Sequence, residues 1–195
     1  MFGVVYGGFI VQGLALGTLF ALYARDRWGR LWQGRVWDLP RAVLGTRPQQ
    51  AASVAAAVLA VLPAGAHLLW ACGSTRGLNA DRIADRTSDF YVVEAQSAGY
   101  LVLAVAAALT LAFRRGRALP VKVPLAAAWV AGAAAACWAG WQATASLVVA
   151  ESAAERPTAL MNLTYAGGMI VGVLVAGLVV RFLVAHPAAA NRRTV

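Results

Sequence analysis

Five long uncharged stretches determine what this sequence can fold into. Each reaches the roughly 18 apolar residues that distinguish a bilayer-spanning helix from a buried helix of a soluble protein. They are Met1–Ala24, Pro48–Thr75, Ala95–Phe113, Val123–Ala150 and Pro157–Val180. The composition also indicates a membrane protein, because 13% of the residues are charged, against about 25% in soluble domains. The sequence therefore predicts a multi-pass protein of the cell membrane, in contact with the lipid bilayer.

Because a bilayer leaves no water for unpaired backbone groups, the spans are expected to be helices. We predict an all-α membrane protein with a single transmembrane domain over residues 1–195. Its bundle of five transmembrane helices is expected at about 2–24, 51–72, 91–113, 124–150 and 158–181.

The basic residues predict the orientation of the spans. Thirteen of the 17 follow spans 1, 3 and 5, namely Arg25, Arg27, Arg30, Arg35, Arg41, Arg47, Arg114, Arg115, Arg117, Lys122, Arg181, Arg192 and Arg193. The positive-inside rule then places the N-terminus outside and the C-terminus in the cytoplasm. A net charge of +9 is also typical of nucleic-acid binding, but no platform of interleaved aromatic residues accompanies it, so no nucleic-acid partner is expected.

The segment between spans 1 and 2 combines arginines with Trp28, Trp32 and Trp37. Tryptophan prefers the headgroup depth of a membrane. We therefore predict a short amphipathic segment lying on the cytoplasmic leaflet after span 1.

Glycines in spans 1 and 5 are typical of close helix–helix contact. Gly13 and Gly17 form a small-xxx-small pair, and Gly167, Gly168 and Gly172 recur in span 5. Such faces let a second helix approach closely. They predict a homo-oligomer that forms through spans 1 and 5.

The cysteines and histidines do not form a metal or redox motif. Cys72 is expected near the outer end of span 2, whereas Cys137 is expected about 20 Å deeper in span 4. This separation is too large for a disulfide without a shift of the helices. The two histidines are far apart in the sequence, so neither a metal nor a cofactor is expected.

Glu94 is the principal candidate for a functional residue. It lies about one turn inside span 3, and a carboxylate in an apolar run is a functional candidate by default. Asp85, Asp89 and Glu151 are the other acids expected near that end of the bundle, so these four are the candidate catalytic residues. The alternative is that Glu94 reaches an arginine of the preceding loop, Arg82 or Arg86, as a structural ion pair.

Aromatic and polar side chains gather at the same depth of the predicted bundle. They belong to spans 2 to 5 and predict one substrate-binding pocket in the outer half of the membrane. Its candidate residues are His67, Trp70, Tyr91, Trp138, Trp141, Gln142, Asn162 and Tyr165.

This combination favours one kind of chemistry. A carboxylic acid removed from water keeps its proton and can act as a general acid. Aromatic faces stabilise a passing positive charge. Acid-initiated cyclisation of a prenylated substrate, or of its epoxide, needs both.

With five spans in about 200 residues, and acids and aromatic residues at the membrane, the chain resembles the small bacterial membrane-integral terpene cyclases that close meroterpenoids. This resemblance implies a proton-donating acid, no metal and a lipophilic substrate. The stretch HLLWACGSTRGL is also similar to small uncharacterised bacterial membrane proteins with a His-x-x-Trp-x-x-Gly element, on His67, Trp70 and Gly73.

Two other classes of function stay open. A non-enzymatic accessory subunit predicts that Glu94 is paired and that the glycine faces bind a partner. A small binder or transporter of lipophilic molecules is the other alternative, although transport needs a polar path through the inner half, which is nearly all Ala, Val, Leu and Gly.

Overall fold

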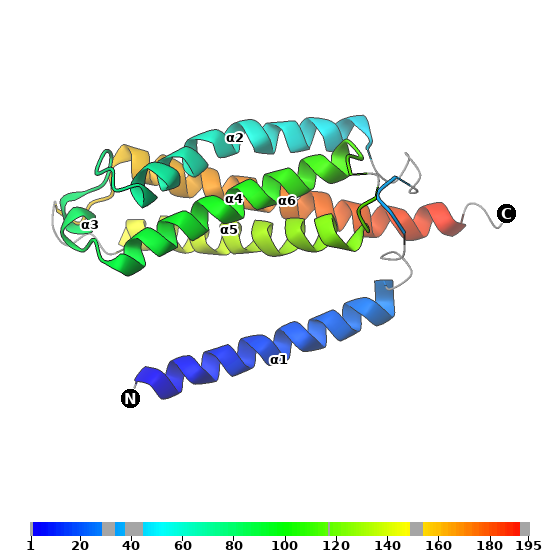
Figure 1. Cartoon of the computed structure of the whole chain (residues 1–195), viewed down its shortest axis with the longest axis horizontal. Helices are drawn as coiled ribbons and strands as arrows, with labels where there is room; N and C mark the ends of the chain where they lie inside the picture. The colour runs from blue at the N-terminus through cyan, green and yellow to red at the C-terminus, as the bar shows by residue number, and fades with distance from the viewer. Residues whose placement is uncertain (1, 29–33, 38–44, 117, 149–153, 192–195) are drawn as a thin grey trace.

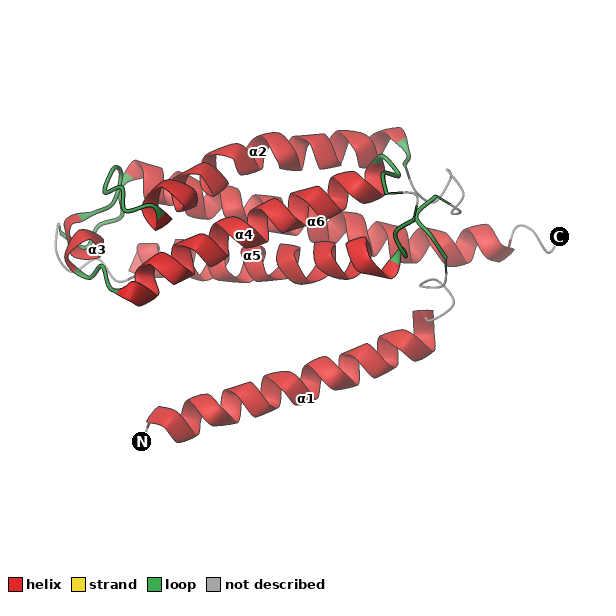
Figure 2. Cartoon of the chain, in the orientation of Figure 1, coloured by secondary structure: helices red, strands yellow, loops and turns green. Residues whose placement is uncertain are grey.

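The computed structural model describes residues 2–28, 34–37, 45–116, 118–148 and 154–191. Within these ranges the regular structure is helical (Figure 2), apart from an isolated bridge between Arg35 and Pro120. The helices are α1 (Phe2–Trp28), α2 (Arg47–Ala71), α3 (Ala80–Ala84), α4 (Ser88–Ala112), α5 (Lys122–Val148) and α6 (Ala159–Asn191). The predicted all-α fold is confirmed.

Four of these helices form a bundle in which α2 packs on α4, α4 on α5, α5 on α6, and α6 closes the ring on α2. Helix α1 lies apart from the bundle (Figure 1). A contact with the bundle is made by Phe20 of α1, whose ring stacks on that of Trp129 of α5 with the ring centroids 6.4 Å apart. The side chains of Val11–Tyr23 are exposed along α1.

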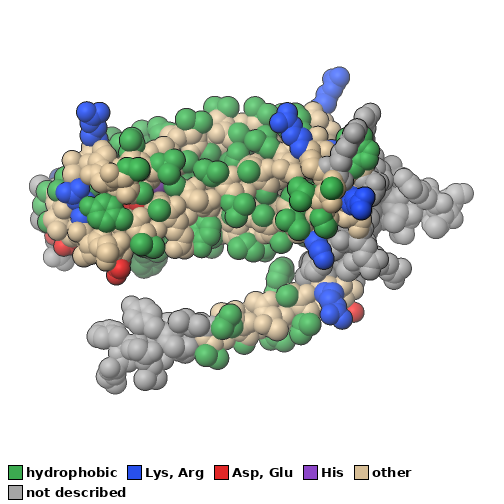
Figure 3. Space-filling view, viewed as in Figure 1, with side chains coloured by type: hydrophobic (Ala, Val, Ile, Leu, Met, Phe, Trp, Pro, Cys, Tyr) green, Lys and Arg blue, Asp and Glu red, His purple; other side chains and the backbone are tan. Residues whose placement is uncertain are grey.

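Among the described residues, four helices are long and apolar enough to cross a membrane: α2, α4, α5 as Lys122–Leu147 and α6 as Ala159–Val184. Helix α1 contributes a shorter apolar stretch, Val11–Tyr23. Charged side chains gather toward the ends of the molecule, and apolar ones cover the visible sides of the bundle (Figure 3). The chain is a multi-pass membrane protein.

Small residues set how closely the helices approach. A Cβ added at Gly172 of α6 would lie 2.5 Å from the Ala136 nitrogen and the Gly132 oxygen of α5. A Cβ added at Gly167 would lie 3.5 Å from Pro63 of α2. The prediction of helix–helix contact is therefore confirmed for span 5. These contacts of the span 5 glycines are made with α2 and α5 of the same chain, and the homo-oligomer stays a prediction.

The two ends of the bundle differ in character. At one end, called here the α3 end, residues 71–88 and 154–158 carry both acids and arginines. At the other, called the basic end, residues 34–37, 45–47 and 112–122 carry basic residues and no acid. All these loops cap a bundle whose middle is largely Ala, Val, Leu and Gly.

At the basic end the structure differs from the predicted amphipathic segment at residues 34–37, a described part of it. Val36 is fully buried, its N–H donates to the Leu119 carbonyl at 3.1 Å, and the Val121 N–H donates to the Gly34 carbonyl at 3.0 Å. Residues 34–37 therefore pair with the α4–α5 loop instead of forming a surface helix, and this pairing gives the N–H group of the buried Val36 a hydrogen-bond partner. Trp28 ends α1, and Trp32 lies outside the described residues.

Candidate functional site

The most unusual contact in the bundle joins a histidine and a glutamate from two neighbouring helices. His67 Nδ1 of α2 lies 2.5 Å from Glu94 Oε2 of α4, and the two residues are 5% and 3% exposed. His67 lies about one turn before the end of α2 and Glu94 nearly two turns after the start of α4, on the faces that pack together. A buried charged group is costly unless it is paired, and here the pairing is direct.

The second oxygen of Glu94 has a partner from outside the bundle. Arg82 Nη2 lies 3.5 Å from Glu94 Oε1, and the Arg82 guanidinium also lies over the Phe90 ring at 5.5 Å. Arg82 is held by the short helix α3, whose N-cap Asn79 accepts a hydrogen bond from the Arg82 N–H at 3.0 Å. The α3 loop is thus fastened onto the bundle by an ion pair.

Aromatic side chains surround this ion pair. Trp70 is 1% exposed, meets the His67 ring edge-to-face at 5.5 Å, and donates from Nε1 to the Arg76 carbonyl at 2.9 Å. Tyr165 of α6 is buried, and its hydroxyl interacts with the side chains of Arg82 and Gln142. Trp70 and Tyr165 form one apolar cluster with Leu78, Phe90 and Met161.

Further hydrogen bonds tie the same loop to the α5–α6 connection. Asn79 donates from its amide to the Glu155 carbonyl at 2.8 Å, and the Thr158 hydroxyl donates to the Gly77 carbonyl. Gly77 has φ = +79°, and a Cβ there would lie 2.3 Å from Leu160. Glycine is required at this close approach.

The chemistry available to this cluster follows from its contacts. A carboxylate–histidine pair can share or pass a proton, and aromatic neighbours can stabilise a cation. Both oxygens of Glu94, however, already have partners within 3.5 Å. In the described geometry Glu94 serves first to hold α2, α4 and α3 together.

The structure brings together His67, Trp70, Glu94 and Tyr165 among the predicted site residues, with Gln142 and Tyr91 at the margin. Tyr91 is half-buried and meets Phe90 edge-to-face at 5.5 Å. The sequence alternatives for the Glu94 partner are resolved in favour of Arg82. Arg86 instead donates to the backbone carbonyls of Ile83 and Gly73.

Other predicted residues lie away from this cluster. Trp138 and Trp141 are 42% and 65% exposed on the outside of α5, and Asn162 is exposed on α6. Successive helical residues are turned by 100°, so Gln142 and Met161 point inward while their neighbours Trp141 and Asn162 point out. The single pocket predicted for all these side chains therefore does not form.

The remaining candidate acids do not join the cluster either. Asp85 caps the C-terminus of α3, Asp89 lies in the first turn of α4, and both are exposed. Asp89 Oδ1 accepts a hydrogen bond from the neighbouring Ser88 at 3.4 Å. Glu151 lies outside the described residues. Among the described residues, no three His, Cys, Asp or Glu side chains gather in a way that could hold a metal.

A groove that the sequence did not predict lies between α4 and α5. It has a volume of about 360 Å³ and is lined by Val93, Gln96, Ser97, Tyr100, Ala134, Cys137 and Trp138. Gln96 is exposed and donates from Nε2 to the Tyr100 hydroxyl at 2.8 Å. The signal in the sequence was the i, i+4 spacing of Gln96 and Tyr100, which places them on one helix face.

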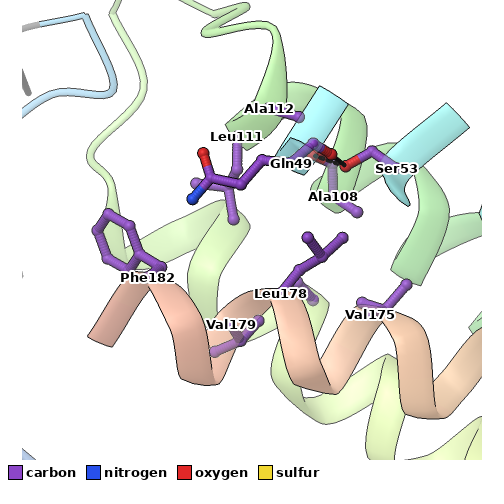
Figure 4. A pocket seen from close by; sticks show the side chains of 10 residues that line it. Gln49, Ser53, Ala108, Leu111, Ala112, Val175, Leu178, Val179 and Phe182 are labelled. Atoms are coloured by element: carbon purple, nitrogen blue, oxygen red, sulfur yellow. Dashed lines mark hydrogen bonds between the residues drawn. The ribbon is translucent and has the colours of Figure 1, made fainter. Parts of the chain in front are cut away.

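A smaller cavity lies between α2, α4, α5 and α6 toward the basic end (Figure 4). Its volume is about 20 Å³, and its walls are apolar except for Gln49 and Ser53. Gln49 Oε1 accepts from the N–H groups of Gly45 and Thr46, and Ser53 donates to the Gln49 carbonyl at 2.8 Å. These polar groups complete the N-terminus of α2, so their role is structural.

Comparison with known proteins gives no relative: no family model, curated protein or solved structure matches this chain.

Proposed function

We propose that this protein crosses the membrane five times, with α1 as the first span, and binds a lipophilic small molecule that carries one polar group. The proposed orientation has the N-terminus outside and the C-terminus in the cytoplasm. It is supported by the excess of arginine and lysine at the basic end, which the positive-inside rule assigns to the cytoplasm.

The α4–α5 groove is the observation that carries the binding proposal. Tyr100 is near the middle of α4, and Cys137 and Trp138 are near the middle of α5, so the groove lies at mid-span depth. A polar side chain at that depth is costly unless it meets a polar partner. Among the described residues Tyr100 is the partner of the Gln96 side chain, and an amide has more donor and acceptor sites than one bond uses.

The ligand that suits this groove has an apolar body and a hydroxyl or carbonyl group. The body would lie against Val93, Ala134 and the ring of Trp138, and the polar group would bond Gln96 or Tyr100. A groove of about 360 Å³ is toward the small end of the usual range for small-molecule sites. Entry would be lateral, from the lipid.

The proposal is tested by photocrosslinking purified full-length protein in nanodiscs with a diazirine analogue of farnesol. We expect crosslinks in the α4 and α5 peptides, competed by unlabelled farnesol. Trp138→Ala should reduce crosslinking at least fivefold, and Trp141→Ala, which changes an exposed tryptophan outside the groove, should not. Equal labelling of all spans, or equal effects of the two variants, would reject the groove as a binding site.

Acid-initiated cyclisation is the second candidate function, and one observation favours it: the paired Glu94 lies among Trp70, Phe90 and Tyr165. Proton delivery would require one partner to leave Glu94. Arg82 is the more separable one, because its contact is longer and it belongs to the five-residue helix α3.

The cyclase candidate is tested with an epoxide of a farnesylated phenol. Formation of a cyclic product that, per amount of folded protein, is lost in Glu94→Gln and retained in Asp89→Asn would support it. If the folded wild-type protein forms no product while farnesol still crosslinks to the groove, the cyclase candidate is rejected and the binding proposal stands.

A further inference from the structure

The α4–α5 groove presents a hydrogen-bond donor that has no acceptor among the described residues. Gln96 Nε2 donates to the Tyr100 hydroxyl at 2.8 Å, so the Tyr100 oxygen is an acceptor and its own hydrogen points elsewhere. We propose that the ligand accepts this hydrogen through a ring carbonyl, and that the groove binds a prenylated quinone. This inference rests on the proposed function of the groove and narrows the class of its ligand.

The numbers of donors and acceptors favour a carbonyl over a hydroxyl. A carbonyl oxygen has two lone pairs, and the groove offers two donors to them, the Tyr100 O–H and the second N–H of Gln96 Nε2. A ligand hydroxyl can accept the same two hydrogen bonds, but its own hydrogen then needs an acceptor. At mid-span depth an unpaired polar hydrogen is costly, because no water is present to bond it.

The Tyr100 hydroxyl is held in place for this role. The Tyr100 ring is half-buried and packs against two buried clusters, one with Ala104 and the other with Leu101. A hydroxyl that accepts a hydrogen bond also donates a stronger one, since bonds in a chain polarise each other. Ser97, the other hydroxyl in the wall, is 9% exposed and donates to the Val93 carbonyl of its own helix at 2.8 Å. Tyr100 is therefore the fixed hydroxyl donor of the groove.

The remaining walls favour a flat, neutral ligand. Tyr100 of α4 and Trp138 of α5 bring an aromatic ring to the groove from each helix, and aromatic faces pack well against another planar ring. Of the described residues that line the groove, none is charged, so a neutral headgroup fits better than the carboxylate of a fatty acid. Gln96 and Trp138 are exposed, so the groove opens to the side of the bundle, where a prenyl chain would extend into lipid.

Displacement of tritiated farnesol from full-length protein in nanodiscs tests the inference, with protein-free nanodiscs as the blank for partition into lipid. The competitors are a geranyl trimethylbenzoquinone, whose ring has no free position to react with a thiol, the corresponding phenol, and the corresponding hydrocarbon. We expect the quinone to displace half of the farnesol at a concentration at least tenfold lower than the phenol or the hydrocarbon requires. Equal displacement by the quinone and the phenol would overturn the inference.

Tyr100→Phe removes the hydroxyl and keeps the ring, so it should reduce the advantage of the quinone over the phenol at least fivefold. Tyr91→Phe is the matched control, because Tyr91 lies on the same helix and does not line the groove, and it should change this advantage less than twofold. Equal effects of the two variants would show that the Tyr100 hydroxyl does not recognise the ligand, and the inference would be wrong.

The outcomes separate this inference from the proposed function. If farnesol binds the protein no better than protein-free nanodiscs, the groove is not a ligand site and the proposed function itself fails. If farnesol binds and crosslinks to the groove but the quinone displaces it no better than the phenol, the binding proposal stands and the carbonyl inference alone fails. If Tyr100→Phe does not fold, the ratio of quinone to phenol in the wild-type protein decides, because it requires no variant.

Discussion

His67 Nδ1 and Glu94 Oε2 meet at 2.5 Å between α2 and α4, in a part of the bundle where both side chains are almost fully buried. The contact joins positions 27 residues apart in the sequence. With Arg82 on the other carboxylate oxygen, Glu94 connects two spans and the loop between them.

Glu94→Gln is expected to destabilise the protein by about 3 kcal/mol, because removing one member of a buried charge pair leaves its partners uncompensated. Thermal unfolding in detergent measures the change. Asp89→Asn is the matched control, since Asp89 is exposed on the same helix, and its effect should stay within about 0.5 kcal/mol. A Glu94→Gln variant that unfolds like the wild type would mean that the pair does not hold the helices together.

Arg82→Gln is expected to loosen the α3 loop more than the bundle. The Arg82 side chain is 33% exposed, and partly exposed ion pairs contribute about 1 kcal/mol or less. Limited proteolysis should therefore cleave residues 73–87 faster, while the helices stay protected. Arg76→Gln is the control, because Arg76 contributes its backbone carbonyl to Trp70, which the substitution keeps. Identical cleavage of the two variants would contradict the role of the Arg82–Glu94 contact.

The membrane class and the helix positions could be predicted because a long apolar run that crosses a bilayer must pair its own backbone groups, which a helix does. The arginine partner of Glu94 was narrowed to Arg82 or Arg86 by distance along the chain, but the choice between them depends on how α3 is capped by Asn79. The closer partner of Glu94, His67, was not predicted, because its contact depends on how α2 and α4 pack against each other. The outward direction of Trp138 and Trp141 could not be predicted, because a helix that is apolar all round carries no signal of which face is buried. The α4–α5 groove depends on the relative rotation of two helices, which tertiary packing sets.

Gly172→Ala tests the close contact of α5 and α6. The new Cβ would lie 2.5 Å from backbone atoms of Gly132 and Ala136, so the helices must separate, at an expected cost of about 1–3 kcal/mol. Gly177→Ala on the same helix is the control, because nothing lies within 4 Å of its added Cβ. Gly177→Ala should leave the melting temperature unchanged or raise it, since alanine favours helix by up to about 1 kcal/mol. Equal melting temperatures for the two variants would contradict the packing.

The two native cysteines test the proposed orientation, so no cysteine has to be introduced. Both are free and exposed, but Cys72 caps α2 at the α3 end, whereas Cys137 lies near the middle of α5, where lipid would surround it. A membrane-impermeant maleimide applied to intact bacteria should therefore label the protein at Cys72. Cys72→Ser should abolish labelling, and Cys137→Ser should preserve it. If the α3 end faced the cytoplasm, labelling of Cys72 would appear only after permeabilisation, and the assignment of the N-terminus to the outside would be wrong.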